Sequence, residues 1–145
     1  MTKIIKIISI LFIAVNFINS VHAENTFLED GIKKYNQKKY EDSKFLFQRS
    51  IVFYPKDYNS YLYLAKIYKF EDNKKEQQKN INTVILLDPK NEEANYLLME
   101  IELKKSNYSK VRELAENFKK FCIKLCDKEK LILESLKDLE PKDES

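Results

Sequence analysis

The chain has 145 residues, a formal net charge of +3 and 34% charged residues, with one glycine, three prolines and no tryptophan. This length allows one domain with a hydrophobic core, and a single glycine leaves little material for tight hairpins or glycine-rich phosphate loops. Because Lys, Glu, Leu, Ile and Asn dominate the composition, we expect an all-α fold.

The first segment has the pattern of an export signal. Lys3 and Lys6 precede a largely apolar run of 12 residues, 7–18, and Ala23 ends a site of the kind that signal peptidase cuts. A helix needs about 20 apolar residues to cross a bilayer. We therefore expect a signal peptide over residues 1–23 and a periplasmic or secreted mature protein, which meets the membrane only before cleavage. An uncleaved anchor and a buried core helix are the alternatives.

Cleavage after Ala23 would remove the chain's only histidine, His22, and lower the formal net charge from +3 to +1. A nearly neutral chain lacks the basic surface that nucleic acids require. Without histidine, the Ser/His/Asp and Cys/His nucleophilic systems have no base, and a typical zinc site has too few ligands. The sequence therefore predicts neither an enzyme nor a nucleic-acid-binding protein, with no cofactor, metal or small-molecule substrate.

Two similar turns recur 34 residues apart, Tyr54-Pro55-Lys56-Asp57 and Asp88-Pro89-Lys90-Asn91. Each follows an apolar helical stretch and precedes an amphipathic one. Proline fits such a turn because it disfavours helix at the residue before it and has no N–H to donate. A period of about 34 residues is typical of helix–turn–helix repeats.

At these positions the chain resembles the tetratricopeptide repeat family. In a first unit from Glu24, Phe27 stands at the usual aromatic position and Gly31 at the small one, and Pro55 closes the unit. The second unit, from Tyr58, has matching residues on one face of its first helix: Tyr61, Leu64, Ala65 and Tyr68. Gln77 replaces a small residue of the second unit, which suggests looser packing there. In the third unit Asn95 and Met99 replace the aromatic and small residues, and the closing proline is missing.

The resemblance implies a right-handed α-α superhelix, a short solenoid of three helix pairs with a C-terminal capping helix. The units span residues 24–57, 58–91 and 92–125, the cap spans 126–139, and 140–145 form a tail. An irregular helical bundle would explain the helical periodicity but not the repeated spacing of 34.

Cys122 and Cys126 have the spacing C-x-x-x-C, which differs from the redox motif C-x-x-C. In the repeat register they flank the turn where earlier units carry proline. One hypothesis is a disulfide that staples this turn in place of the missing proline. Buried thiols, and a redox or metal role, are the alternatives.

By resemblance, the first helix of each unit faces the concave side of the solenoid, where a partner would bind. The candidate partner-binding residues on these helices are Tyr35, Asn36, Asn59, Leu62, Lys66, Lys69, Phe70 and Tyr96. Packing on neighbouring helices is the alternative role for the aromatic members. Tyr35, Tyr54, Tyr58 and Tyr63 are not required by the repeat pattern, which favours the first two units as the contact surface.

These observations predict a scaffold or adaptor that captures a protein or peptide during cell-envelope assembly or secretion. The alternative is a structural module of an envelope complex that associates with itself, so a homo-oligomer is compatible with the sequence.

Overall fold

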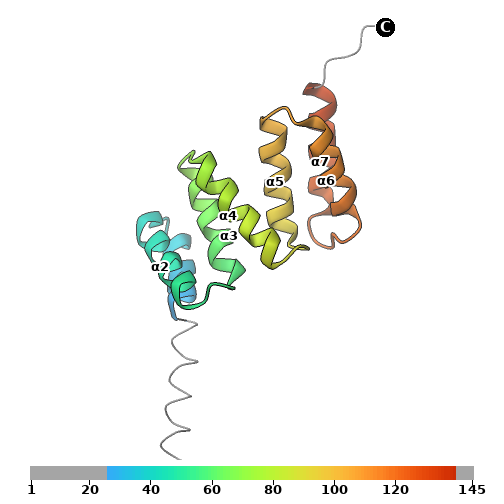
Figure 1. The fold of residues 1–145 in the computed structure, drawn as a ribbon. Coiled ribbons are helices and arrows are strands. Elements are labelled where there is room, and N and C mark those ends of the chain that lie inside the picture. The colour runs from blue at the N-terminus through green and yellow to red at the C-terminus, as the bar shows by residue number, and fades with distance from the viewer. Residues whose placement is uncertain (1–25, 140–145) are drawn as a thin grey trace, which may run out of the picture. The chain divides into compact units, whose positions relative to one another are not determined.

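The computed structural model describes residues 26–139, and all regular secondary structure in that range is helical (Figure 1). Residues 26–36 form the first helical stretch. Six further helices follow in chain order: α2 (Tyr40–Phe53), α3 (Tyr58–Phe70), α4 (Lys74–Leu87), α5 (Glu92–Lys104), α6 (Tyr108–Lys119) and α7 (Cys126–Leu139). The predicted signal peptide and tail lie outside the described residues. Within residues 26–139 no helix is long and apolar enough to cross a membrane.

The turns inside the three helix pairs share one backbone conformation. Lys38, Asp72 and Ser106 have positive φ angles of 60°, 53° and 57°, and they are spaced 34 residues apart. Beside each of them, an N–H of the next residue reaches back five residues, as in Lys39 N–H to Lys34 O at 3.0 Å. This bond and the left-handed residue form a Schellman-type helix end. It pairs backbone carbonyls of the last turn, which have no partner within the helix.

The described residues divide into two compact units, 26–63 and 64–139. In the first unit, Gly31 lets two helices approach closely. A Cβ atom at Gly31 would lie 2.6 Å from Cε1 of the fully buried Phe47. The Ser43 hydroxyl donates a hydrogen bond to the Gly31 carbonyl at 2.9 Å. The small residue at this position is therefore required by packing and not by backbone conformation.

In the second unit, α5 packs against α4, α6 and α7, and α6 packs against α7 (Figure 1). Its C-terminal core is a cluster of buried side chains: Met99, Val111, Ala115, Phe118, Ile132 and Leu136. Gln77, where looser packing was expected, is only 7% exposed. An amide side chain is thus accommodated in the buried face of α4.

Candidate partner-binding surfaces

Within the second unit, six polar and charged side chains of α3, α5 and α7 form a connected surface, here called the charged face. Its members are Lys66, Lys69, Glu93, Tyr96, Glu100 and Lys128. The Lys66 ammonium lies 2.8 Å from the Glu93 carboxylate, and that of Lys69 lies 2.5 Å from Glu100. These residues meet because positions 93, 96 and 100 lie on one side of α5, spaced by three and four residues.

Tyr96 lies at the centre of the charged face. Its hydroxyl donates a hydrogen bond to Glu100 Oε1 at 3.0 Å, and the Lys128 ammonium lies 5.6 Å from the centre of its ring. Partial burial raises the pKa of the Tyr96 hydroxyl, and the hydrogen bond and negative charge of Glu100 raise it further. The phenol therefore stays protonated and acts as a donor. Lys69 of α3 and Lys128 of α7 are thus linked through side chains of α5.

Each ion pair of the charged face is partly solvated, so it contributes at most about 1 kcal/mol to folding. Its chief effect is to hold charges of both signs, and one aromatic ring, in fixed positions. Such a surface can bind a polar chain through hydrogen bonds and charge complementarity. Among the residues that the structure describes, no group of three potential metal-ligating side chains is present.

The structure places the predicted partner-binding residues in different environments. Lys66, Lys69 and Tyr96 belong to the charged face, and Phe70, at the end of α3, is 71% exposed. Leu62 is a correction: it is only 7% exposed, because it lies on the packed side of α3. A partner cannot reach this side chain without a rearrangement of the helix.

The candidates of the first unit form no comparable network. Tyr35 is half-buried, and its ring lies 5.6 Å from that of Tyr40 and 5.1 Å from that of Tyr63. Tyr63 in turn stacks on buried Phe47 at 5.0 Å. Tyr35 and Tyr63 thus have packing roles that the repeat pattern does not require. Asn36 is exposed, whereas Asn59 is half-buried.

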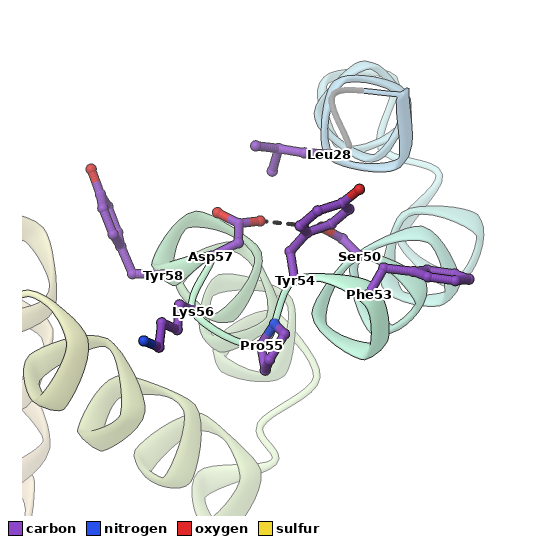
Figure 2. Close-up of a pocket in the computed structure, with 8 residues that line it drawn as sticks. All are labelled: Leu28, Ser50, Phe53, Tyr54, Pro55, Lys56, Asp57 and Tyr58. Atoms are coloured by element: carbon purple, nitrogen blue, oxygen red, sulfur yellow. Dashed lines mark hydrogen bonds between the residues drawn. The ribbon is translucent and has the colours of Figure 1, made fainter. Parts of the chain in front are cut away.

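A pocket of about 460 Å³ lies beside the turn between α2 and α3, and it was not predicted from the sequence (Figure 2). Its lining residues are Leu28, Ser50, Phe53, Tyr54, Pro55, Lys56, Asp57 and Tyr58. Figure 2 shows Leu28, on the first helical stretch, facing Tyr54 and Asp57 of the turn. The one sequence signal was that Tyr54 and Tyr58 are not explained by repeat packing.

Internal hydrogen bonds occupy the carboxylate in this pocket. Asp57 Oδ2 accepts hydrogen bonds from the hydroxyls of Ser50 at 3.2 Å and Ser60 at 2.5 Å, while Oδ1 accepts one from the Asn59 N–H at 3.1 Å. Both serines are buried. Asp57 therefore fixes the start of α3, and its carboxylate has a structural role in the pocket.

The two cysteines are joined in the structure. Cys122 and Cys126 form a disulfide with their Cα atoms 5.4 Å apart. The bond spans the turn between α6 and α7, since Cys126 is the first residue of α7. Of the three alternatives for these cysteines, the geometry matches the disulfide.

Neither a protein-family model nor a curated protein matches the sequence. Among solved structures, the chain is similar to the Yersinia enterocolitica type III secretion chaperone SycD in complex with a peptide of the translocator YopD. The two are 17% identical, with a TM-score of 0.70 over 78% of this chain and 91% of SycD. An alternative dimer of SycD matches at 17% identity and a TM-score of 0.68, over 84% and 95% of the two chains.

The TPR domain of Sgt2 from Aspergillus fumigatus is also similar, at 16% identity and a TM-score of 0.66, over 85% of this chain and 87% of that domain. Identities this low carry information on the fold alone. The predicted all-α tetratricopeptide-repeat fold is therefore confirmed.

Proposed function

We propose that the protein is an exported adaptor that captures a protein or peptide on the charged face and performs no catalysis. The observation that carries this proposal is the chain of contacts from Lys69 through Glu100 and Tyr96 to Lys128. A partner that supplies both a carboxylate and a cation can pair with these groups. Because their geometry is fixed before binding, the entropy cost of binding is lower.

The similar structures support a binding role. SycD was solved in complex with a peptide of its translocator, and its fold matches this chain over most of both lengths. For the present chain we propose the same class of ligand, a peptide segment of a protein. In the second unit, the candidate residues that suit such contacts are Lys66, Lys69 and Tyr96 of the charged face and the exposed Phe70.

Two features support export. The basic and apolar pattern of residues 1–23 is that of a signal peptide, and a disulfide such as Cys122–Cys126 persists mainly in oxidising compartments. The setting we propose is the periplasm or the cell exterior, with a role in envelope assembly or secretion.

The test uses the protein purified from the envelope with its bound partner. Replacing Lys66, Lys69 and Phe70 by alanine should weaken partner binding by tenfold or more, roughly the effect of losing one strong contact at an interface. The matched control replaces Lys90, Lys119 and Leu139 by alanine, which also removes two lysines and one exposed apolar side chain but lies off the charged face. Equal affinity of the two variants in isothermal titration calorimetry would remove the charged face from the binding site.

Self-association is the second candidate, and a specific surface favours it. Phe45, Val52 and Phe53 of α2 are 57%, 76% and 58% exposed. The Arg49 guanidinium lies 4.5 Å from the Phe27 ring and 5.8 Å from the Phe45 ring. Exposed apolar groups of this kind mark contact surfaces. Light scattering after size exclusion tests it: a dimer that Val52→Ser together with Phe53→Ser converts to monomer supports self-association, and a wild-type monomer contradicts it.

A further inference from the structure

Helix α7 begins without the side-chain cap that starts α3 and α5. Asp57 accepts a hydrogen bond from the Asn59 N–H at 3.1 Å, and Asn91 accepts one from the Ala94 N–H at 3.0 Å. The residue 34 positions after Asn91 is Leu125, whose side chain has no acceptor. The turn before α7 therefore lacks the side-chain cap of the two earlier turns between helix pairs.

A carboxylate from a different turn binds this backbone. Glu92, the first residue of α5, accepts hydrogen bonds from the N–H groups of Ile123 at 2.9 Å, Lys124 at 2.9 Å and Leu125 at 2.7 Å. Burial raises the pKa of the Glu92 carboxyl, but the three amide hydrogen bonds and the Lys124 charge outweigh it and lower the pKa below its ordinary value. Ionised Glu92 thus ties the start of α5 to the turn before α7.

The three amides belong to the residues that the disulfide encloses. Both ends of this loop also bond to helical backbone: the Cys122 N–H donates to Phe118 O at 2.9 Å, and the Lys128 N–H donates to Leu125 O at 2.9 Å. A covalently closed loop has few conformations, so its three N–H groups stay directed at one point with little further loss of entropy. The disulfide and Glu92 therefore stabilise the same loop geometry.

The loop determines how α7 is attached to the second unit. Ile132 and Leu136 of α7 are 5% and 2% exposed and belong to the buried cluster with Phe118 of α6 and Met99 of α5. Leu125 and Cys122 themselves pack against this cluster. If the loop loses its fixed geometry, the contact that covers these apolar side chains is weakened.

We infer that the Cys122–Cys126 disulfide is a redox-sensitive latch for α7, and that Glu92 couples the disulfide to the docking of this helix. A dithiol reductant breaks the S–S bond. Two electrons and two protons pass to the cysteine sulfurs, giving two thiols, and the reductant becomes a disulfide. The opened loop no longer holds its amides against Glu92, so α7 detaches more often and uncovers the cluster. By linkage, the Glu92 contact favours the oxidised form to the same extent.

The first test measures the thiol–disulfide equilibrium constant of the full chain against glutathione, with and without the Glu92 contact. A hydrogen-bonded charge of this kind typically changes such an equilibrium about tenfold. We expect Glu92→Gln to favour the dithiol form by about this factor, whereas Glu113→Gln, which alters an exposed carboxylate of α6 that pairs with Lys110, leaves the constant at its wild-type value. Equal constants for the two variants would overturn the coupling.

The second test follows amide hydrogen exchange in the oxidised and the reduced protein. Amides of residues 123–139 should exchange at least about tenfold faster after reduction, while those of α2 should not change. The double variant Cys122→Ser, Cys126→Ser, with circular dichroism to show that it keeps its helices, should match the reduced protein. Unchanged exchange in α7 after reduction would contradict the latch.

Discussion

Gly31 shows at the scale of one residue why a small side chain is needed where two helices meet. We expect Gly31→Ala to lower the free energy of unfolding by about 1–3 kcal/mol, since the added methyl group would overlap the ring of buried Phe47. Urea denaturation measures the change, with Ser135→Ala on the exposed face of α7 as control. A more stable Gly31→Ala variant would mean that helix propensity dominates and that the ring moves freely.

Lys38 and Asp72 occupy equivalent left-handed positions with different side chains. A left-handed conformation costs an ordinary residue about 1 kcal/mol or more, but Asp less. Lys38→Gly should therefore raise the free energy of unfolding by about 0.5–1 kcal/mol, and Asp72→Gly by less. Thermal unfolding of the two variants measures both changes in stability. A larger increase for Asp72→Gly than for Lys38→Gly would contradict this account.

The lowered pKa of Glu92 predicts a pH dependence of stability. Because the folded-state pKa lies below the ordinary value of 4.5, the carboxylate stabilises the fold above that pH, and the contribution is lost as pH falls through the folded-state pKa. The stability difference between wild type and Glu92→Gln should be largest near pH 7 and shrink below about 4.5. Urea midpoints from pH 7 to 3 measure it, and a difference independent of pH would contradict the role of the ionised carboxylate.

At the scale of elements, the third helix pair differs from the first two. Helices α2 and α4 have 14 residues each, whereas α6 has 12, and the turn after α6 is correspondingly longer. The next helix still begins 34 residues after the start of α5. The disulfide and Glu92 thus replace the short proline turn by a longer, cross-linked one.

The attachment of α7 can be tested through its buried face. Leu136→Ala should lower the free energy of unfolding by about 2–4 kcal/mol, because the side chain is 2% exposed and its removal leaves a cavity in the cluster. Leu139→Ala, in the same helix at 55% exposure, is the matched control and should change stability by less than about 1 kcal/mol. Similar losses in the two variants would mean that the cluster is loosely packed.

The sequence predicted the helices better than the binding surface. Proline turns and helical periodicity are local signals, so the helices that start at Tyr58 and Glu92 could be located from them. The ion pairs of Lys66 and Lys69 join residues about 30 positions apart and depend on tertiary geometry. Leu62 was assigned to the partner surface from its register position, whereas its burial depends on how α3 packs.

Glu92 illustrates the same limit more sharply. An acidic residue in the first turn of a helix is expected from the helix dipole alone, so its type and position do not indicate a second role. Its three amide partners lie 31 to 33 residues away, and no local pattern in the sequence links them to Glu92. Those amides lie in the loop that the two cysteines close, so the contact depends on tertiary geometry.

At the scale of the whole chain, export predicts a definite mature form. The protein isolated from the producing cell's envelope or medium should begin at Glu24, because the small-residue site ends at Ala23. Intact-mass measurement tests this. The Ala23→Asp variant should keep residues 1–23, because the substitution blocks cleavage. A full-length wild-type protein held at the membrane would favour the uncleaved anchor.

The three left-handed residues at 38, 72 and 106 also limit where residues can be inserted into the chain. Each sits in a three-residue turn, and one inserted residue there would break the backbone hydrogen bond that reaches back five residues and would displace the start of the following helix. Between pairs, the longer connection after α6 is offset by a shorter helix: α6 has 12 residues where α2 and α4 have 14, so the spacing of 34 between helix starts is kept. Single-residue insertions should therefore be eliminated from the turns within helix pairs, and a longer connection between pairs should be accompanied by a shorter helix.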